Sequence, residues 1–176
     1  MRWMWIDRII ELAPGRRLVA IKNVSMAEDH LHDHFPARPA HAGRPARPAI
    51  PVMPASLIIE GMAQTAGILV GHAAAFREKV ILAKVGKAEL HEDVPPGFTL
   101  RYTATIAHMD PAGAATTGVV ELLDPATGAA RPIGAIDLMF SHLDRNLAGA
   151  QFPEGNFVFS DSFRNLLRAS GIAADF

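Results

Sequence analysis

One carboxylate stands where an ionised side chain is hardest to keep. Glu60 is the only formally charged residue between Ala55 and Phe76, inside the apolar run LIIEGMAQTAGILV. A carboxyl group in such a place must be paired, be hydrogen-bonded, or keep its proton through a raised pKa. Gln64 stands one helical turn further on and could hold it. Two interpretations stay open: a buried acid satisfied by Gln64 and a basic partner, or a catalytic acid tuned by its surroundings.

A second group with useful chemistry is His34, which ends the stretch DHLHDH. In an extended chain His30, His32 and His34 would share one face, and with Asp29 and Asp33 they resemble a metal-binding strand. Short histidine tracts are weak evidence for metal, and no distant ligand motif answers this one, so we expect no metal site. A histidine that titrates near neutrality could act instead as a general base.

The residues around Glu60 should form one long helix. Pro54 precedes roughly twenty residues dominated by good helix formers, and proline is tolerated near a helix start. The segment is apolar on every side, which predicts a helix enclosed by protein. Glu60, Gln64 and His72 would each be costly in lipid, so we expect no membrane span.

Extended segments lie on both sides of that helix. RIIELAPGRRLVAIKNVS predicts a hairpin that turns at Pro14-Gly15. Four β-rich segments follow Lys79, separated by the turn signals PPG, DPAG and DPATG, and they indicate an antiparallel meander. These segments are residues 80–94, 98–109, 114–123 and 131–143. A sheet curved around a single apolar helix makes α+β the expected class.

Composition narrows the range of functions. The chain has 176 residues, is 49% hydrophobic and carries a net charge of −1, which suits one globular domain and gives no electrostatic case for nucleic acid or a membrane surface. Cysteine is absent, so disulfides and thiolate sites are excluded. The N-terminal residues lack the pattern of a signal peptide, and we expect a cytoplasmic protein.

Residues 145–176 are expected to be an extension packed on the domain or on a partner subunit. Phe152, Phe157, Phe159 and Phe163 are too many aromatics for a free tail. SDSFRNLLRASG predicts a short helix that begins at Ser160 or Asp161, buries Phe163, Leu166 and Leu167, and ends at Gly171. We interpret these aromatics as packing rather than as a ligand site.

The motifs carry a family resemblance. HFP, followed by PVMPASLIIEGMAQ, resembles the signature His-Phe-Pro-Gly-x-Pro-x-Met-Pro-Gly-x-Leu-x-x-Glu-Ala-Met-Ala-Gln of the 3-hydroxyacyl-[acyl-carrier-protein] dehydratases of bacterial fatty-acid synthesis. IDRIIELAPGRRLVAIKNVS, PPGFTLRY and AIDLMF are similar to other parts of that family. The resemblance covers about residues 5–142, within a dehydratase domain expected at 1–144.

The resemblance implies a hotdog fold and a homodimer, or a trimer of such dimers, that acts without metal or nucleotide on thioesters of acyl-carrier protein. It assigns His34 of one subunit and Glu60 of the other to catalysis, and the N–H of Ala55 to the thioester carbonyl. The chemistry fits, because dehydration needs a base for the α-proton and an acid for the leaving hydroxide. Substrate contacts are expected from Phe35, Val52, Met53, Pro54 and Gln64.

The chain departs from the family pattern in several places. His34 and Glu60 are 26 positions apart, about 12 more than in the pattern, and the additional residues fall within 37–51. Proline recurs there at every third position, as in polyproline II, which predicts a stiff excursion. Ala55 replaces glycine and could tighten the carbonyl pocket, while Asp33 beside the histidine could raise its pKa. Gly61 replaces alanine, with only a modest helix cost expected.

Two main interpretations of the insertion stay open, and a proline-rich ligand for another domain is a weaker third. The insertion is either a solvated surface loop or a flap whose basic side chains meet an acidic carrier protein or a phosphopantetheine phosphate. The basic side chains are Arg38, Arg44 and Arg47. Our leading hypothesis for the whole protein is the dehydratase, and the alternatives are a hotdog thioesterase and a non-catalytic carrier-binding or scaffold protein.

Overall fold

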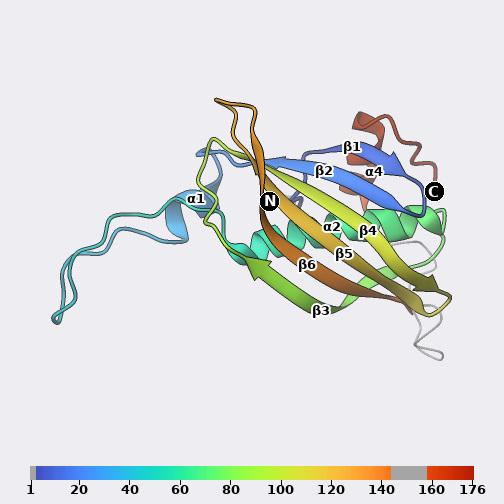
Figure 1. Ribbon diagram of the computed structural model, residues 1–176, viewed down its shortest axis with the longest axis horizontal. Coiled ribbons are helices and arrows are strands. Elements are labelled where there is room, and N and C mark those ends of the chain that lie inside the picture. Colours follow the sequence, from blue (N-terminus) through green and yellow to red (C-terminus); the bar gives the residue numbers. More distant parts are fainter. Residues whose placement is uncertain (1–2, 144–157) are drawn as a thin grey trace.

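The computed structural model describes residues 3–143 and 158–176, and the side chain of Asp33 lies outside the described part. Figure 1 shows the arrangement of the elements. In chain order they are β1 (Arg8–Ala13), β2 (Arg17–Asn23), α1 (Asp29–Asp33), α2 (Ala55–Ala73), β3 (Val80–Leu90), β4 (Thr99–Asp110), β5 (Gly113–Leu123), β6 (Ala130–His142) and α4 (Asp161–Ala169). The predicted hairpin, long helix and four following strands are all present.

The strands form one antiparallel sheet in the order β1-β2-β4-β5-β6-β3. The hairpin turns at Gly15, whose positive φ of 66° favours glycine. β4, β5 and β6 form the expected meander. The position of β3 was predicted wrongly, because β3 pairs with β6 at the far edge and residues 91–98 bring the chain back to β4. Turn signals show where a strand ends, but not which strand it will pair with.

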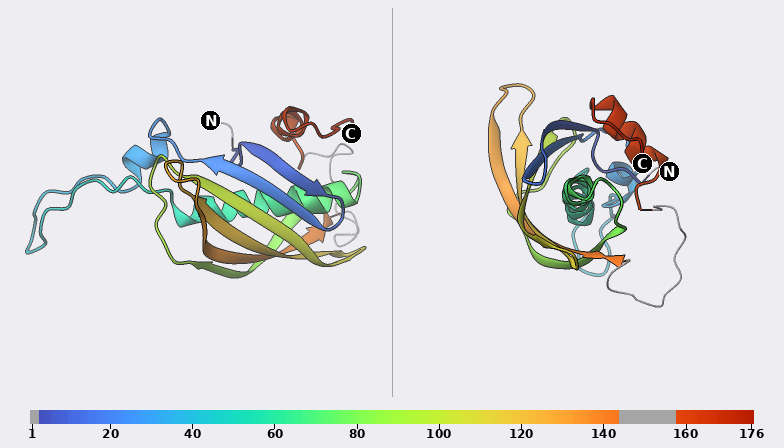
Figure 2. Two further views of the ribbon diagram at one scale, coloured as in Figure 1. Left: turned by 45° about the horizontal axis from the view of Figure 1, so that its top comes forward. Right: turned by 90° about the vertical axis from the view of Figure 1, so that its right-hand side faces the viewer.

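The long helix α2 lies in the concave side of the sheet, as the end-on view of Figure 2 shows. This arrangement confirms the α+β hotdog fold. The buried residues of α2 pack against the inward-facing side chains of the central strands. Along these strands, inward-facing side chains alternate with outward-facing ones. The largest fully buried side chains include Ile58, Met62, Ile68, Leu69, Leu100, Tyr102, Leu122 and Ile136. Within residues 3–143 and 158–176, no helix is long and apolar enough to cross a membrane.

One close approach fixes the distance between α2 and the sheet. A Cβ atom on Gly61 would lie 2.6 Å from the Tyr102 hydroxyl oxygen and 2.9 Å from the backbone oxygen of Trp5. Tyr102 is fully buried, and burial raises the pKa of its phenol. Glycine at position 61 is therefore a packing requirement of this chain, and not the nearly neutral exchange that the sequence suggested.

Residues 35–50 form an arm that projects from the body beside the start of α2 (Figure 1). The two sides of the arm exchange backbone hydrogen bonds of 2.8–3.1 Å at every third residue. The bonded pairs are Phe35–Ile50, Arg38–Arg47 and His41–Arg44. The prolines occupy positions between the bonded residues, where no N–H is needed. The period of three expected for polyproline II is thus present, but as a two-sided ladder rather than a single stiff excursion.

The C-terminal segment packs on the body. α4 begins after Ser160 and is followed by Gly171, which has the positive φ of 76° expected of a helix end. Leu166 and Leu167 are buried as predicted, while Phe163 is only partly buried. The Ile9 N–H donates to Ser170 Oγ at 3.0 Å, which ties α4 to β1.

An aromatic cluster anchors the same segment to the far end of α2. Phe159 is 2% exposed and lies edge-on to Phe76, with ring centres 4.9 Å apart. Phe176 stacks on Phe76 at 4.2 Å. The other two predicted aromatics, Phe152 and Phe157, lie outside the described residues.

Candidate active site

The start of α2 is held firmly while its first amide is open. Met53 is buried and its N–H donates to Val94 O at 2.8 Å. Pro54 is the N-cap, with no side-chain cap. Ala55 is exposed, and within the described residues its N–H has no acceptor. An open amide at the positive end of a helix can bind an oxygen that gains negative charge.

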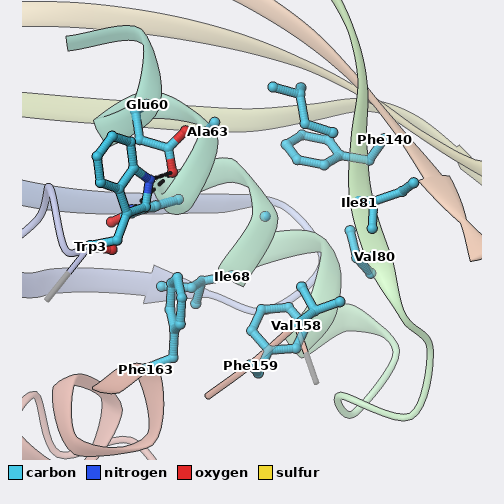
Figure 3. Close-up of a pocket in the computed structure, with 13 residues that line it drawn as sticks. Trp3, Glu60, Ala63, Ile68, Val80, Ile81, Phe140, Val158, Phe159 and Phe163 are labelled. Carbon is cyan, nitrogen blue, oxygen red and sulfur yellow. Dashed lines mark hydrogen bonds between the residues drawn. The ribbon is translucent and has the colours of Figure 1, made fainter. Parts of the chain in front are cut away.

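Glu60 is held by two donors on one oxygen (Figure 3). The Trp3 indole N–H and the Gln64 amide each donate to Glu60 Oε1 at 3.0 Å. Gln64 is itself fixed, because its Oε1 accepts the Trp5 N–H at 2.8 Å and its amide also donates to Trp3 O at 3.1 Å. The prediction that Gln64 holds the carboxyl group is therefore confirmed, but the sequence did not indicate Trp3.

The burial expected of Glu60 is not complete in a single chain. Its side chain is only partly buried, Ala55 and Ser56 are exposed, and Ile59 is half-buried. From Gly61 to Gly71 the helix is buried apart from the half-buried Gly67, and Gln64 is only 5% exposed. The expectation of an all-round buried helix was thus wrong for its first turns, because no described element of the same chain covers that face.

His34 lies at the C-terminal end of α1, with its side chain exposed. Its ring packs edge-on against Phe35, with ring centres 4.4 Å apart. Among the described residues it forms no hydrogen bond with Glu60, whose partners are Trp3 and Gln64. One chain therefore supplies the two expected catalytic groups at separate places.

The histidine stretch is helical, which changes the geometry on which the metal alternative depended. His30 packs against the Trp5 ring at 5.1 Å, and the His32 ring is hydrogen-bonded to Met26 O at 2.6 Å. Residues at alternate positions of a helix point in different directions. In the part of the chain that the structure describes, no group of three His, Cys, Asp or Glu side chains could hold a metal ion.

The expected substrate-binding residues fall into two groups. Gln64 lines the cavity next to Glu60. Phe35 and Val52 are half-buried, and Met53 and Pro54 are buried in the chain that leads into α2. The structure of one chain does not bring this second group to Glu60.

A cavity of about 280 Å³ runs along α2 from Glu60 (Figure 3). Apart from Glu60 and Gln64, its walls are almost entirely apolar. They comprise Trp3, Ala63, Gly67, Ile68, Val80, Ile81, Leu82, Phe140, Val158, Phe159 and Phe163. Sequence reasoning missed Trp3 and treated Phe159 and Phe163 as packing alone. The number of aromatic residues in the C-terminal segment indicated that the segment would pack, but not where it would pack.

A second hollow of about 290 Å³ lies at the start of α2. It is lined by Met53, Ala55 and Ile58 and by the end of β3 with the three residues that follow it, residues 90–93. The sequence HED at 91–93 supplies its polar wall. Ala55, whose amide is open, is one of its lining residues, and the sequence did not indicate this hollow.

Comparison with known proteins identifies the family. A family model described as FabA-like domain matches residues 48–123. The chain is 36% identical over 107 residues to the 3-hydroxyacyl-[acyl-carrier-protein] dehydratase FabZ of Magnetococcus marinus, which covers 59% of this chain and 62% of that protein. It is also 36% identical over 108 residues to the FabZ dehydratase of Symbiobacterium thermophilum, covering 61% and 68% respectively.

Solved structures agree on the fold. The acyl-CoA hydrolase of Staphylococcus aureus superposes with a TM-score of 0.55 at 13% identity, covering 73% of this chain and 66% of that one. Zebra fish thioesterase superfamily member 2 superposes with a TM-score of 0.53 at 13% identity, covering 76% and 79%. At such identities the likeness concerns the fold alone. The chain spans about three-fifths to two-thirds of the dehydratases that it matches, and on that sequence similarity it belongs to the 3-hydroxyacyl-[acyl-carrier-protein] dehydratase FabZ family.

Proposed function

We propose that this protein is a dehydratase that converts 3-hydroxyacyl thioesters of acyl-carrier protein to trans-2-enoyl thioesters and water. The observation that carries the proposal is the state of Glu60. Both donors bind Oε1, and Oε2 has no hydrogen bond among the described residues. Because Oε1 already accepts two N–H groups, Oε2 is the oxygen that is left to exchange a proton with a substrate.

The proposed reaction uses this free oxygen of Glu60. The His34 imidazole removes a proton from C2 of the substrate, the C2–C3 double bond forms and the C3–O bond breaks. Glu60 gives its proton to the departing oxygen, which leaves as water. The Ala55 N–H donates a hydrogen bond to the thioester oxygen, where negative charge develops, and the α2 dipole stabilises that charge. The reaction balances without an oxidant, and we expect no metal or nucleotide cofactor.

The proposal includes a homodimer, in which His34 of one subunit meets Glu60 of the other. Its support is the open face of α2 together with β3, which is an edge strand in the described sheet. β3 exposes Leu82 by 40% and Val85 by 42%. A long edge strand with exposed apolar side chains can pair with another chain, and a second copy would cover both features at once. Trimers of such dimers remain compatible with the proposal.

We propose acyl-carrier protein as the partner and the arm as its docking element. Residues 36–53 contain no acidic side chain, and residues 36–49 are exposed. Arg38 and Arg44 have no acidic partner among the described residues, whereas Arg47 lies over the Phe35 ring at 6.0 Å. An exposed cationic arm beside the active site would attract an acidic carrier. The compartment proposed for the reaction is the cytoplasm.

The function is tested by incubation with a 3-hydroxyacyl thioester while enoyl absorbance and free thiol are both followed. We expect enoyl product, lost by at least about a hundredfold in His34→Ala and Glu60→Gln, since a proton-transfer group contributes that much. Free thiol without enoyl would instead assign a thioesterase, and neither product would assign a scaffold. Mixing the two variants should restore part of the activity if subunits exchange, because one mixed site then has both groups.

The carrier contact needs its own experiment. In Arg38→Ala/Arg44→Ala, we expect a higher KM for the carrier-bound substrate at low salt and no change for a pantetheine thioester. Arg77→Ala is the matched control, because Arg77 is exposed beyond the other end of α2. An unchanged KM in the double variant would leave the arm as a solvated loop.

A further inference from the structure

The apolar cavity beside Glu60 is elongated along α2. It begins at the carboxyl group and follows α2 past Ala63 and Gly67 to Ile68. Gly67 contributes no side chain, and a Cβ there would still lie 3.5 Å from the Phe140 ring, so the middle of the cavity has room. The β3–β6 edge forms the wall along its length, through Val80, Ile81, Leu82 and Phe140.

The far end of this cavity is built by the C-terminal segment. Val158, Phe159 and Phe163 line it, and in Figure 3 they lie at the opposite end from Glu60. Phe159 is seated against Gly71, where any added Cβ would collide with its ring. Phe163 meets Phe159 edge-on, with ring centres 5.9 Å apart. Phenyl rings that contact each other therefore line this end of the cavity.

From this geometry we infer that the cavity holds the acyl chain and that Phe159 and Phe163 limit its length. The inference rests on the proposed function, since it takes Glu60 as the group next to the reacting carbon. The rise of an α-helix places Gly71 about 16 Å beyond Glu60 along the axis. An apolar chain that enters at Glu60 therefore meets the phenyl rings after about that distance.

The volume sets the class of substrate. A dry cavity of about 150 Å³ accommodates the six carbons of benzene. On the same scale the 280 Å³ found here corresponds to roughly ten to twelve carbons. The acyl groups that fit are medium-length, unbranched and apolar to their end, because within the described lining only Glu60 and Gln64 are strongly polar.

The test compares kcat/KM for 3-hydroxyacyl thioesters from about four to about sixteen carbons. For the unaltered protein we expect a rise with length and then a fall of about tenfold or more beyond roughly twelve carbons. Each methylene that finds apolar space strengthens binding about fourfold. Phe163→Ala should therefore extend the optimum by two or more methylenes and raise kcat/KM for a fourteen-carbon chain about tenfold. Phe163 is only partly buried, which makes this variant the better choice for retaining the fold.

Gly67→Leu is the converse variant. It fills the middle of the cavity, so the optimum should move to shorter chains. A general loss of packing would not move the optimum in opposite directions in the two variants. Phe176→Ala is the matched control, because this ring belongs to the same cluster but does not line the cavity, and the length profile should stay as it is.

The outcomes separate the two proposals. An unaltered protein that forms no enoyl product at any length contradicts the proposed function. Activity that continues to rise to sixteen carbons, or an identical length profile in Phe163→Ala and the unaltered protein, overturns the acyl-chain limit alone. Purified variants are compared by their unfolding midpoints, and a folded Phe163→Ala with an unchanged optimum counts against the proposal.

Discussion

The arm and the C-terminal segment are both additions around the same central helix, but they behave in opposite ways. The arm, residues 35–50, is exposed along almost its whole length and is held together by backbone hydrogen bonds. The C-terminal segment, residues 158–176, is held by buried aromatic and aliphatic side chains. Proline, alanine and arginine offer little apolar area to bury, whereas phenylalanines offer a great deal. Composition therefore decides which addition projects and which one packs.

The way the arm is attached explains how the fold tolerates it. The Ile50 N–H donates to Phe35 O at 3.0 Å, so the two ends of the arm meet as the first and last residues of a β-turn would. Pro36 follows Phe35, at the position where proline favours such turns. The arm is thus an insertion between Pro36 and Ala49, which would be the second and third residues of that turn. His34 and the lead-in to α2 can keep their places however long the arm is.

The largest effect is expected from the packed addition, in Phe159→Ala. Phe159 is 2% exposed and contacts the rings of Phe76, Phe163 and Phe176. Removing a buried phenyl ring costs about 3–5 kcal/mol of unfolding free energy. Urea unfolding of both proteins measures the difference.

Trp3→Ala serves for comparison in that experiment. Trp3 also lines the cavity, but it is 60% exposed, and its loss should cost far less stability. A cost of under about 1 kcal/mol in Phe159→Ala would mean that the segment does not depend on this ring.

A smaller effect is expected in Gly71→Ala. The added methyl group would collide with the Phe159 ring and lie 3.0 Å from Phe76 Cδ1. Overpacking of this kind costs about 1–3 kcal/mol, partly offset by the better helix propensity of alanine. Thermal unfolding measures it. If Phe159→Ala is made first, the same Gly71→Ala exchange should become neutral or stabilising, and additive effects would contradict the contact.

These residues show what could be predicted from the sequence and what could not. Alternating patterns and turn signals predicted the strands, and the apolar run predicted α2, because both depend on local periodicity. The partner of β3 and the docking site of Phe159 depend on contacts between distant residues, which a local pattern does not specify. In the candidate site, Gln64 was predicted because it lies one turn from Glu60, while Trp3 was missed because it lies 57 positions away.

Of the two additions, the arm is the one whose removal should change the free energy of unfolding less. Excision of residues 37–48, combined with Ala49→Gly, joins Pro36 directly to position 49 and brings Phe35 and Ile50 to the ends of a β-turn. The existing Phe35–Ile50 hydrogen bond can close that turn, and glycine suits its third position. We expect a change of less than about 1 kcal/mol, since shortening an exposed loop has little effect on closure entropy. Urea unfolding checks this value, and activity on a pantetheine thioester should be retained.

The same excision also tests whether the arm, unlike the C-terminal segment, makes no packing contacts. A large loss of stability would show that the arm packs on a second subunit rather than projecting into solvent. Loss of activity with the fold retained would place the arm in the site itself.

The smallest effect concerns the root of the arm, where α1 joins the body. Burial lowers the pKa of His30, although Glu28 opposes the shift, and the His30 ring packs on Trp5. The unfolded chain therefore binds a proton more readily than the folded chain, and stability should fall as the pH decreases through about 6.5, the ordinary pKa of the group. In His30→Leu this contribution is absent, so stability measured at pH 7.5 and pH 5.5 should differ less than in the unaltered protein. If the two proteins show the same difference in stability between pH 7.5 and pH 5.5, protonation of His30 does not affect the stability of the fold. The root would then behave like the exposed arm and not like the packed segment at the other end of α2.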